Sequence, residues 1–487
     1  MAQPERASEQ QTSEHRAPEQ QAREQGGGAG EVGAGAAADV APAEDAPAQG
    51  TAGTPPASPA GDAAQAAAPE AADAEVTAPD PRDARATAGT GAHPAAVAAA
   101  VPLVQLLDED GVRHDDERFS AWVEDIDAAA LQDIHRSMVR ARRLDEMATS
   151  LQRQGQLALW PPLRGQEAAQ VGSARAMGEH DRVFPSYREH AVVLERGVPA
   201  DQVMLQFRGH AASGWKPSET GTHVYSLVLA SQVPHAVGYA MGIDQDRRLA
   251  AAAGDPLPER GAVTVYFGDG SSTEGEVHES MVFAAAYDAP VVFFVQNNQW
   301  AISVPFSTQS RVPLAARAAG YGFEGVRVDG NDPLAVLAVT RWATAEARAG
   351  RGPVLVEAET YRLGAHTTAD DPTKYRLSAE ESEWAQREPL LRTRALLERE
   401  HGVEAAWFEQ LEEETARWLS GVRSDLLESE PGDLDQRFDV VYAQHHPLVE
   451  EERAWYRDYR DSFLDEDEPA DADEATGARS GDEGERA

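Results

Sequence analysis

The chain has 487 residues, and its 83 acidic side chains outnumber its 43 lysines and arginines, which gives a formal net charge of −40. Nucleic acid and anionic membranes are therefore not expected as partners, because both bind basic surfaces. The sequence has no cysteine, so this chain cannot form disulfides, thiolate metal sites or a cysteine nucleophile.

Composition divides the chain into three parts. Residues 1–95 consist mainly of Ala, Pro, Gly, Glu and Gln, and residues 464–487 are acidic. Neither segment can bury enough apolar surface to offset chain entropy, so both are predicted to be disordered tails, and residues 96–463 to form the folded domain. We find no apolar signal segment at the amino terminus and no apolar stretch of the roughly 20 residues that a membrane span needs, so a cytoplasmic protein is expected.

Apolar spacing predicts alternating strands and helices between the tails. Strands are predicted at 104–111 (a short strand with a turn), 262–267, 290–295, 326–328 and 353–358. Helices are predicted at 131–154, 167–177, 274–287, 333–349 and, as a charged amphipathic group, 378–428. Asp127 and Asp332 are expected N-caps. The alternation predicts an α/β fold with a doubly wound, mostly parallel sheet, helices on both faces and further helices at the carboxyl end.

Two polar segments follow consecutive predicted strands. Gly268-Asp269-Gly270 follows 262–267, and Asn297-Asn298 follows 290–295. In open α/β sheets ligands bind beyond the carboxyl ends of the strands, and a helix that starts there favours phosphate. The Asp269 carboxylate and the Asn298 amide oxygen are ligands that suit Mg²⁺ shared with a diphosphate. The spacing therefore predicts a site for both.

This pair resembles the thiamine-pyrophosphate (TPP) fingerprint. The surrounding sequence, from about residue 104 to residue 442, resembles the alpha subunit of the decarboxylating component of 2-oxo acid dehydrogenase complexes. Further stretches that carry the resemblance are 153–156, 165–168, 187–190, 328–332 and 361–367. The resemblance implies that residues 96–463 are a TPP-binding dehydrogenase domain.

The resemblance also implies individual roles around the cofactors TPP and Mg²⁺. The implied Mg²⁺ ligands are Asp269, Asn298 and the backbone carbonyl of Trp300. The residues implied to bind TPP are Tyr187 and Arg188 at the phosphates, Gly268, Gly270 and Ser271 along the diphosphate, and Leu229 beneath the bent cofactor.

His366 is the implied catalytic residue, facing the thiazolium carbon. An imidazole can donate or accept a proton near neutral pH, which suits that role. His190 matches a position that is His in some relatives and Ala in others. Some relatives bind a monovalent cation near the positions of Ser226, Ser231 and Gln232.

Two positions bear on the substrate. Ala365 stands where branched-chain relatives have a second His, and Gln296 where they have Arg, so both favour the bacterial pyruvate type. The first hypothesis is therefore the alpha subunit of pyruvate dehydrogenase, with TPP-dependent oxidative decarboxylation of pyruvate and acetyl transfer to lipoamide. The alternatives are a branched-chain (2-oxoisovalerate) dehydrogenase subunit and a non-catalytic diphosphate-binding scaffold. Thr367 and Thr368 lie where animal relatives carry a regulatory phosphoserine.

The sequence provides one doubly wound domain of the TPP type. The resemblance therefore implies that TPP binds between this chain and a beta subunit. The expected assembly is a heterotetramer of two alpha and two beta chains, docked on a lipoyl-bearing dihydrolipoamide acyltransferase and acting on a small 2-oxo acid.

Overall fold

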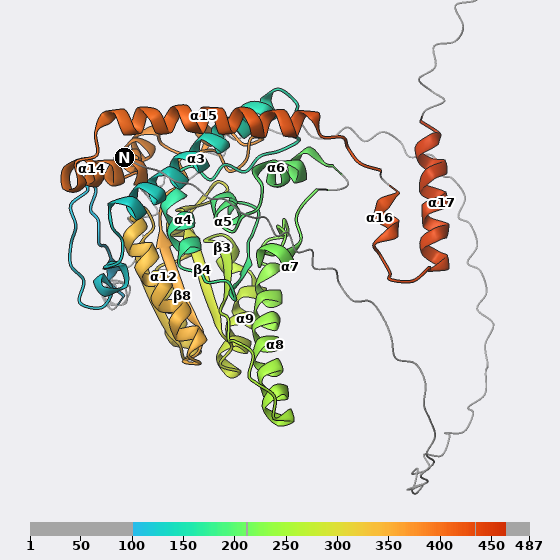
Figure 1. Cartoon of the computed structure of the whole chain (residues 1–487), viewed down its shortest axis with the longest axis horizontal. Coiled ribbons are helices and arrows are strands. Elements are labelled where there is room, and N and C mark those ends of the chain that lie inside the picture. Colours follow the sequence, from blue (N-terminus) through green and yellow to red (C-terminus); the bar gives the residue numbers. More distant parts are fainter. Residues whose placement is uncertain (1–100, 211–212, 434, 464–487) are drawn as a thin grey trace, which may run out of the picture. The chain divides into compact units, whose positions relative to one another are not determined.

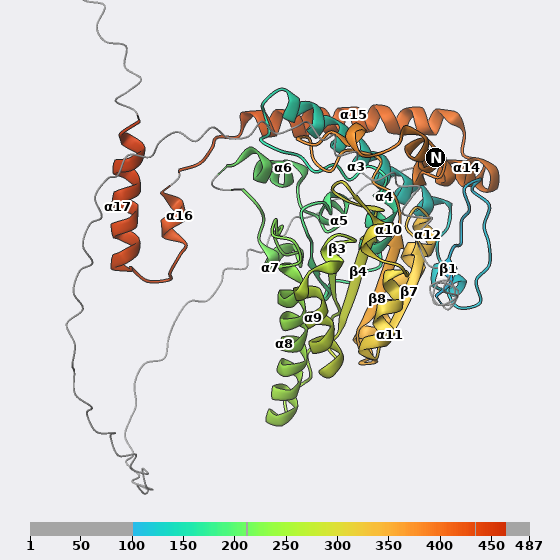
Figure 2. The same ribbon diagram turned by 180° about the vertical axis from the view of Figure 1, so that it is seen from behind.

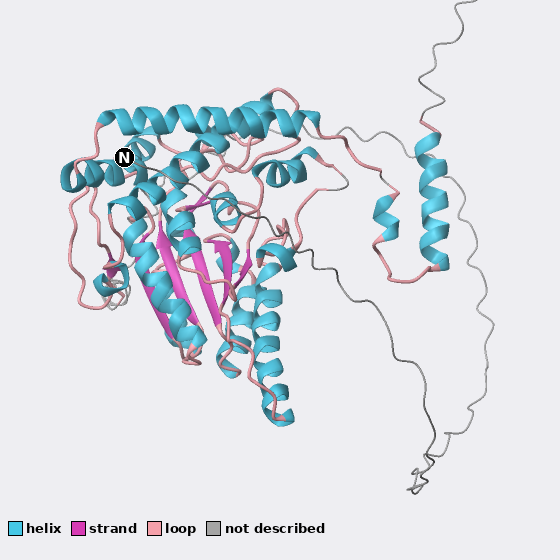
Figure 3. Cartoon of the chain, in the orientation of Figure 1, coloured by secondary structure: helices cyan, strands magenta, loops and turns pink. Residues whose placement is uncertain are grey.

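A computed structural model describes residues 101–210, 213–433 and 435–463, so the tails predicted at 1–95 and 464–487 lie outside the described residues. Within those ranges the main sheet has the strand order β1-β7-β8-β4-β3-β2, and every neighbouring pair is parallel (Figure 3). Its strands are Leu103–Val104 (β1), Arg182–Phe184 (β2), Val263–Gly268 (β3), Val291–Asn297 (β4), Glu324–Asp329 (β7) and Val354–Glu359 (β8). The predicted α/β class with a mostly parallel sheet is confirmed.

A small antiparallel hairpin, Trp300–Ala301 (β5) with Val304–Pro305 (β6), follows β4. The α-helices are Ala128–Arg153 (α3), Glu167–Arg175 (α4), His190–Glu195 (α5), Ala200–Arg208 (α6), Pro217–Thr220 (α7), Gln232–Ala253 (α8), Gly275–Ala286 (α9), Phe306–Gln309 (α10), Ala318–Tyr321 (α11), Pro333–Arg348 (α12), Ser378–Ala385 (α13), Pro389–His401 (α14), Ala405–Glu428 (α15), Gln436–Asp439 (α16) and Pro447–Asp461 (α17). Short 3₁₀ turns lie at Ser120–Val123, Ser271–Thr273, Leu314–Arg317 and Pro372–Lys374.

Helices cover both faces of the sheet. Successive side chains of a strand point to opposite faces, so Tyr266 and Phe294 join the core beneath α3, α4 and α12 (Figure 1), whereas Val265 and Phe293 join the core beneath α8, α9 and α11 (Figure 2). The central strand β4 is buried along its whole length. This explains why its sequence is a continuous apolar run rather than an alternating one.

Local sequence signals correctly predict α3, α4, α9, α12 and the α13–α15 group, whereas the other α-helices were not predicted. Asp127 caps α3 by accepting a hydrogen bond from the Ala130 N–H, and Asp332 caps α12. The sequence analysis did not predict α8, because Gly238 and Gly242 lower its helix propensity. It is nevertheless a helix, since one of its faces packs against β3 and α9. Among the described residues, no helix has the length and apolar character that a bilayer crossing requires.

Helices α14 and α15 lie over the edge of the domain where the strands end. Both α14 and α15 contact α3, and α15 also contacts α6 (Figure 1). The expected group of charged amphipathic helices at 378–428 is therefore present as α13, α14 and α15. Of these, α15 buries Phe408, Leu411 and Leu426 while leaving most of its charged residues in solvent.

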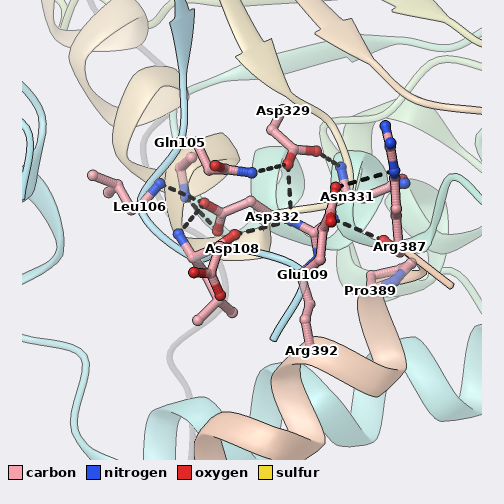
Figure 4. Close-up of polar contacts among 12 residues, drawn as sticks. Gln105, Leu106, Asp108, Glu109, Asp329, Asn331, Asp332, Arg387, Pro389 and Arg392 are labelled. Atoms are coloured by element: carbon pink, nitrogen blue, oxygen red, sulfur yellow. Dashed lines mark hydrogen bonds and ion pairs between the residues drawn. The ribbon is translucent and has the colours of Figure 1, made fainter. Parts of the chain in front are cut away.

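A buried polar network holds the amino-terminal strand to the sheet (Figure 4). The Asp332 carboxylate, which caps α12 with one oxygen, accepts hydrogen bonds through the other from the backbone N–H groups of Leu106 and Leu107, each at 2.6 Å. One fully buried side chain thus fixes both the start of α12 and the chain that follows β1.

Asp329 extends this network to α14. Its Oδ2 accepts hydrogen bonds from Gln105 Nε2 and from Arg392 Nη1, both at 2.8 Å. Arg392 is 1% exposed and also donates to the Leu107 carbonyl at 2.9 Å. The ion pair therefore joins the end of β7, the chain after β1 and helix α14 (Figure 4).

We predict that Arg392→Met lowers the free energy of unfolding by about 3 to 5 kcal/mol, because it leaves the buried Asp329 carboxylate without its cation. Urea denaturation followed by circular dichroism measures the change. The control is Arg417→Met, which removes an exposed pair with Glu413 at 3.9 Å and should cost less than about 0.5 kcal/mol. Equal losses in the two variants would show that the buried pair has no special role.

Candidate functional site

A cleft of about 540 Å³ opens at the carboxyl ends of β3 and β4. Every residue that the sequence analysis placed at the cofactor or the metal lines it: Tyr187, Arg188, Leu229, Gly268, Asp269, Gly270, Ser271, Asn298, Trp300 and His366. These residues come from segments that are far apart in the chain. The fold therefore brings the whole predicted set to one place.

The register of β3 and β4 positions the two central residues. Gly268 pairs with Gln296 in this parallel ladder, so Asp269 and Asn298 leave neighbouring strands at the same edge. Asp269 is 1% exposed and Asn298 is 6% exposed. A carboxylate oxygen, an amide oxygen and the Trp300 carbonyl are hard ligands that could hold a divalent cation here.

Polar side chains hold each of these three groups. Gln309 Nε2 donates to Asp269 Oδ2 at 2.9 Å. Asn298 Nδ2 donates to Gln166 Oε1 at 3.3 Å, and the Trp300 carbonyl accepts from Arg362 Nη1 at 2.9 Å. A carbonyl oxygen has two lone pairs, so that of Trp300 can accept this bond and still face the cleft.

Burial raises the pKa of Asp269 above its ordinary value, while the hydrogen bond from Gln309 and the nearby Arg362 act in the opposite direction. A buried carboxylate of this kind is stabilised in its charged form by a cation. The electrostatics of the cleft therefore favour a positively charged ligand at Asp269.

The two glycines beside Asp269 serve different purposes. A Cβ added at Gly268 would meet nothing within 4 Å, so its open side faces free space along the cleft. A Cβ added at Gly270 would lie 2.9 Å from the Cβ of Ala301. Gly270 therefore lets the β5–β6 hairpin pack onto the turn, in addition to the close ligand approach that the sequence predicts for both glycines.

His366 is held in one protonation state by Arg188. Burial, together with the charges of Arg188 and Arg362, lowers the pKa of His366 to about 3, so its ring is neutral at physiological pH. Arg188 Nη2 lies 3.2 Å from His366 Nδ1 and donates to the His366 carbonyl at 2.9 Å. A guanidinium only donates, so Nδ1 is an acceptor and the ring proton sits on Nε2.

The loop that carries His366 is tied to the hairpin. Arg362 Nη2 donates to the Ile302 carbonyl at 2.7 Å and to the Tyr375 hydroxyl at 3.1 Å. Tyr375 donates in turn to Asp370, whose carboxylate accepts from the His366 N–H at 2.8 Å. Ile302 has φ of 54°, which is rare and strained for a β-branched residue. The strain lies on the rim of the cleft.

His190 does not line the cleft. Its Nδ1 lies 2.9 Å from the Tyr225 hydroxyl and its Nε2 lies 3.0 Å from the Pro161 carbonyl, which accepts the ring proton. Its ring stacks on Trp160 with centroids 4.1 Å apart. These contacts give His190 a packing role beneath the cleft.

The positions linked with a cation in some relatives also come together. The Ser226 and Ser231 hydroxyls are hydrogen-bonded to each other, and Ser231 Oγ donates to the Val228 carbonyl at 2.9 Å. Gln232 Nε2 donates to the Tyr266 carbonyl, and its Oε1 is buried without a hydrogen-bond partner among the described residues.

Several residues in or next to the cleft carried no usable sequence signal. Gln309 is a single polar residue forty positions from the carboxylate it contacts. Leu159 and Phe207 line the cleft but occur in ordinary apolar segments. Arg362 lies within the 361–367 stretch that carries the resemblance, so it could have been singled out there.

The chain is similar in sequence to a family of known proteins. A family model described as "Dehydrogenase E1 component" matches residues 135–420. The chain is 42% identical over 371 residues to the 3-methyl-2-oxobutanoate dehydrogenase subunit alpha of Mycobacterium tuberculosis, which covers 75% of this chain and 96% of that relative. It is 35% identical over 363 residues to the pyruvate dehydrogenase E1 component subunit alpha of Staphylococcus epidermidis, which covers 73% of this chain and 93% of that relative.

The chain therefore belongs to the dehydrogenase E1 component family, whose members use thiamine pyrophosphate. Within it, the chain is an alpha subunit of a 2-oxo acid dehydrogenase, which implies a beta subunit and a transacylase as partners. The resemblance stated from the sequence is confirmed at this level. The identities to branched-chain and pyruvate types do not establish which acid is the substrate.

We predict that His190 makes the protein lose stability in acid. Burial lowers the pKa of His190 from 6.5 to about 3. The unfolded chain therefore takes up a proton at a pH where the folded chain does not, and stability falls as pH drops from about 6.5 towards 3. Between pH 7 and pH 5, His190→Gln should lose about 2 kcal/mol less unfolding free energy than the wild type. Urea titrations at both pH values measure this, and His445→Gln, at an exposed position, is the control that should behave as wild type.

Proposed function

We propose that this chain and a beta subunit together catalyse TPP-dependent oxidative decarboxylation of a small 2-oxo acid and transfer the acyl group to a lipoyl-bearing acyltransferase. The observation that carries the proposal is the convergence of residues 187–188, 229, 268–271, 298, 300 and 366 on one cleft. A diphosphate-binding scaffold would not need a neutral, oriented histidine in the same cleft, so the enzyme is the better explanation.

In this proposal Asp269, Asn298 and the Trp300 carbonyl would hold Mg²⁺, whose charge would stabilise the diphosphate of TPP. The donor set fits, because all three oxygens are hard ligands and the carboxylate is buried. Gly268, Gly270 and Ser271 line the diphosphate.

Tyr187 and Arg188 act at the phosphate end. The Arg188 guanidinium can serve a phosphate and His366 together because it has five donors in a fixed fork. Leu229, which is 43% exposed and lines the cleft, supports the cofactor from below.

Bound TPP supplies the carbanion chemistry that makes decarboxylation possible. His366 then acts at the reacting end of the cleft. Its neutral ring presents Nε2–H, so it donates a hydrogen bond from that atom while Arg188 holds Nδ1. The low pKa of His366 keeps the ring in this neutral form at neutral pH, so Nε2–H stays available as a hydrogen-bond donor to the reacting group.

The beta subunit is proposed to cover the cleft. Leu227 and Val228, beside Leu229, are 67% and 72% exposed. A run of exposed apolar side chains at the mouth of a binding cleft is typical of an interaction surface. We propose an assembly of two alpha and two beta chains.

A branched-chain 2-oxo acid is our first candidate substrate. The 42% identity to a 3-methyl-2-oxobutanoate dehydrogenase subunit supports it, as do the apolar side chains of Leu159, Phe207 and Leu227 along the cleft. Pyruvate is the second candidate, favoured by Gln296 and Ala365. Gln296 is weak evidence for pyruvate, because both ends of its amide are used within the protein. Its Nε2 donates to Glu189 at 2.7 Å and its Oε1 accepts from Gln170 at 3.2 Å.

The cofactor proposal is tested by titrating TPP and Mg²⁺ into the chain with and without its beta subunit. We expect Asp269→Asn to weaken Mg²⁺-dependent TPP binding by roughly 100-fold or more, since even groups that only support a metal ligand contribute about 10- to 100-fold. Glu276→Gln, an exposed change on α9, is the matched control and should bind as wild type. Absence of TPP binding by the wild-type pair would refute the proposal.

The substrate is tested by decarboxylation with the reconstituted alpha–beta pair. We expect kcat/KM for 3-methyl-2-oxobutanoate to exceed that for pyruvate by about 10-fold or more, because each additional methyl group in an apolar pocket contributes about 1 to 3 kcal/mol. Release of CO₂ from carboxyl-labelled acids measures both rates. A higher value for pyruvate would make the second candidate the substrate.

A further inference from the structure

We propose that Gln309 is a positioning residue for the metal: its amide fixes the Asp269 carboxylate in the orientation that binds a divalent cation. The inference rests on the proposed Mg²⁺ site and extends it to a residue outside the cleft lining. The hydrogen bond in question joins Gln309 to the Asp269 carboxylate from outside the cleft.

The contact has only one chemically sensible arrangement. Gln309 Nε2 lies 2.9 Å from Asp269 Oδ2. An ionised carboxylate only accepts hydrogen bonds, so the NH₂ group of the amide faces Asp269. The same NH₂ group donates to the Val304 carbonyl at 3.3 Å, which holds the side chain of Gln309 against its own hairpin. Asp269 lines the cleft whereas Gln309 does not, so the bond occupies Oδ2 from behind.

The segment that contains Gln309 also contains the other two candidate metal ligands, Asn298 and Trp300. Asn298 and Trp300 lie at the start of this segment, which turns through the β5–β6 hairpin into α10. The Phe306 N–H donates to the Gln299 carbonyl at 2.8 Å, which closes the segment on itself. A single continuous stretch, 298–309, thus contributes two metal-binding oxygens and the amide that orients the third ligand.

The hairpin is docked firmly where Asp269 emerges. The Cβ of Ala301 occupies the space left by the absent side chain of Gly270. On its other side, Arg362 donates to the carbonyls of Trp300 and Ile302 at 2.9 and 2.7 Å. These contacts hold the hairpin in place, so the position of Gln309 relative to Asp269 is fixed.

The amide contributes little to stability for its own sake. Gln309 Oε1 is buried and has no hydrogen-bond partner among the described residues. An unpaired buried acceptor is destabilising, and this cost offsets the hydrogen bond that the other half of the amide makes. A side chain of the same shape without the amide should be tolerated by the fold. A variant with such a side chain would no longer hold the Asp269 carboxylate in one orientation.

Gln309 engages Oδ2, whereas Oδ1 of Asp269 has no side-chain hydrogen-bond partner among the described residues and stays available to a ligand in the cleft. A carboxylate that is already oriented does not lose rotational freedom when the cation binds. Hydrogen bonds of this kind typically contribute about 10- to 100-fold to metal affinity. Arg362 at the Trp300 carbonyl and Gln166 at Asn298 are comparable supports, but each also packs against other parts of the site, so Gln309 gives the cleanest test.

The test compares Gln309→Met with wild type in the reconstituted alpha–beta assembly, using Mn²⁺ as the probe. Methionine matches the length of glutamine and lacks its donor. We expect Mn²⁺ affinity, measured by electron paramagnetic resonance in the presence of TPP, to fall by about 10- to 100-fold. At saturating Mg²⁺, TPP binding and turnover should return to within about threefold of wild type, in line with a defect confined to metal affinity. Thr308→Val, an exposed change in the same short helix, is the control and should leave Mn²⁺ affinity unchanged.

Two results would overturn the proposal. One is unchanged Mn²⁺ affinity in Gln309→Met. The other is a loss of TPP binding that excess Mg²⁺ does not restore, accompanied by a lower unfolding temperature without metal, which would indicate a structural role only. If the wild-type assembly itself binds neither Mn²⁺ nor TPP, the proposed cofactor site fails rather than the role of Gln309 within it.

Discussion

The parallel pairing of β3 with β4 is the constraint on which the site depends. Because Gly268 stands opposite Gln296, Asp269 and Asn298 leave the sheet side by side although a whole helix separates them in the chain. A shift of this register by one residue would turn one of the two side chains to the other face of the sheet. The apolar side chains that bury both strands, such as Phe267 and Phe293, fix the register, so the core and the site are specified together.

Around that pair the cleft is completed by segments whose positions depend on one another. Arg188 comes from the chain after β2, His366 from the loop after β8, and both meet in one hydrogen-bonded contact. Arg362 then connects the His366 loop to the hairpin that follows β4. Arg188 and Arg362 are both buried and so place two fixed positive charges beside the cleft, where limited contact with solvent strengthens their effect on a ligand.

The fold was predictable where a signal is local. The apolar runs of β3, β4 and β8 and the caps Asp127 and Asp332 identified their elements from a few neighbouring residues. The residues around Asp269 were predictable because a resemblance to a family names positions. Gln309 could not be found in this way, since its role arises only when the hairpin folds back. The helix α8 was missed for a similar reason, because its glycines oppose a helix that tertiary packing imposes.

Ile302 suggests how this protein would respond to selection for heat resistance. A β-branched residue with φ of 54° stores on the order of 1 to 3 kcal/mol of backbone strain. Glycine or asparagine would adopt the same turn more easily, so thermostability screens would be expected to enrich them at this position. The enriched clones would carry a looser rim beside Trp300 and could gain melting temperature at the expense of turnover. Because Ile302 lines the cleft, a stabilising substitution there would also change the surface that a ligand meets.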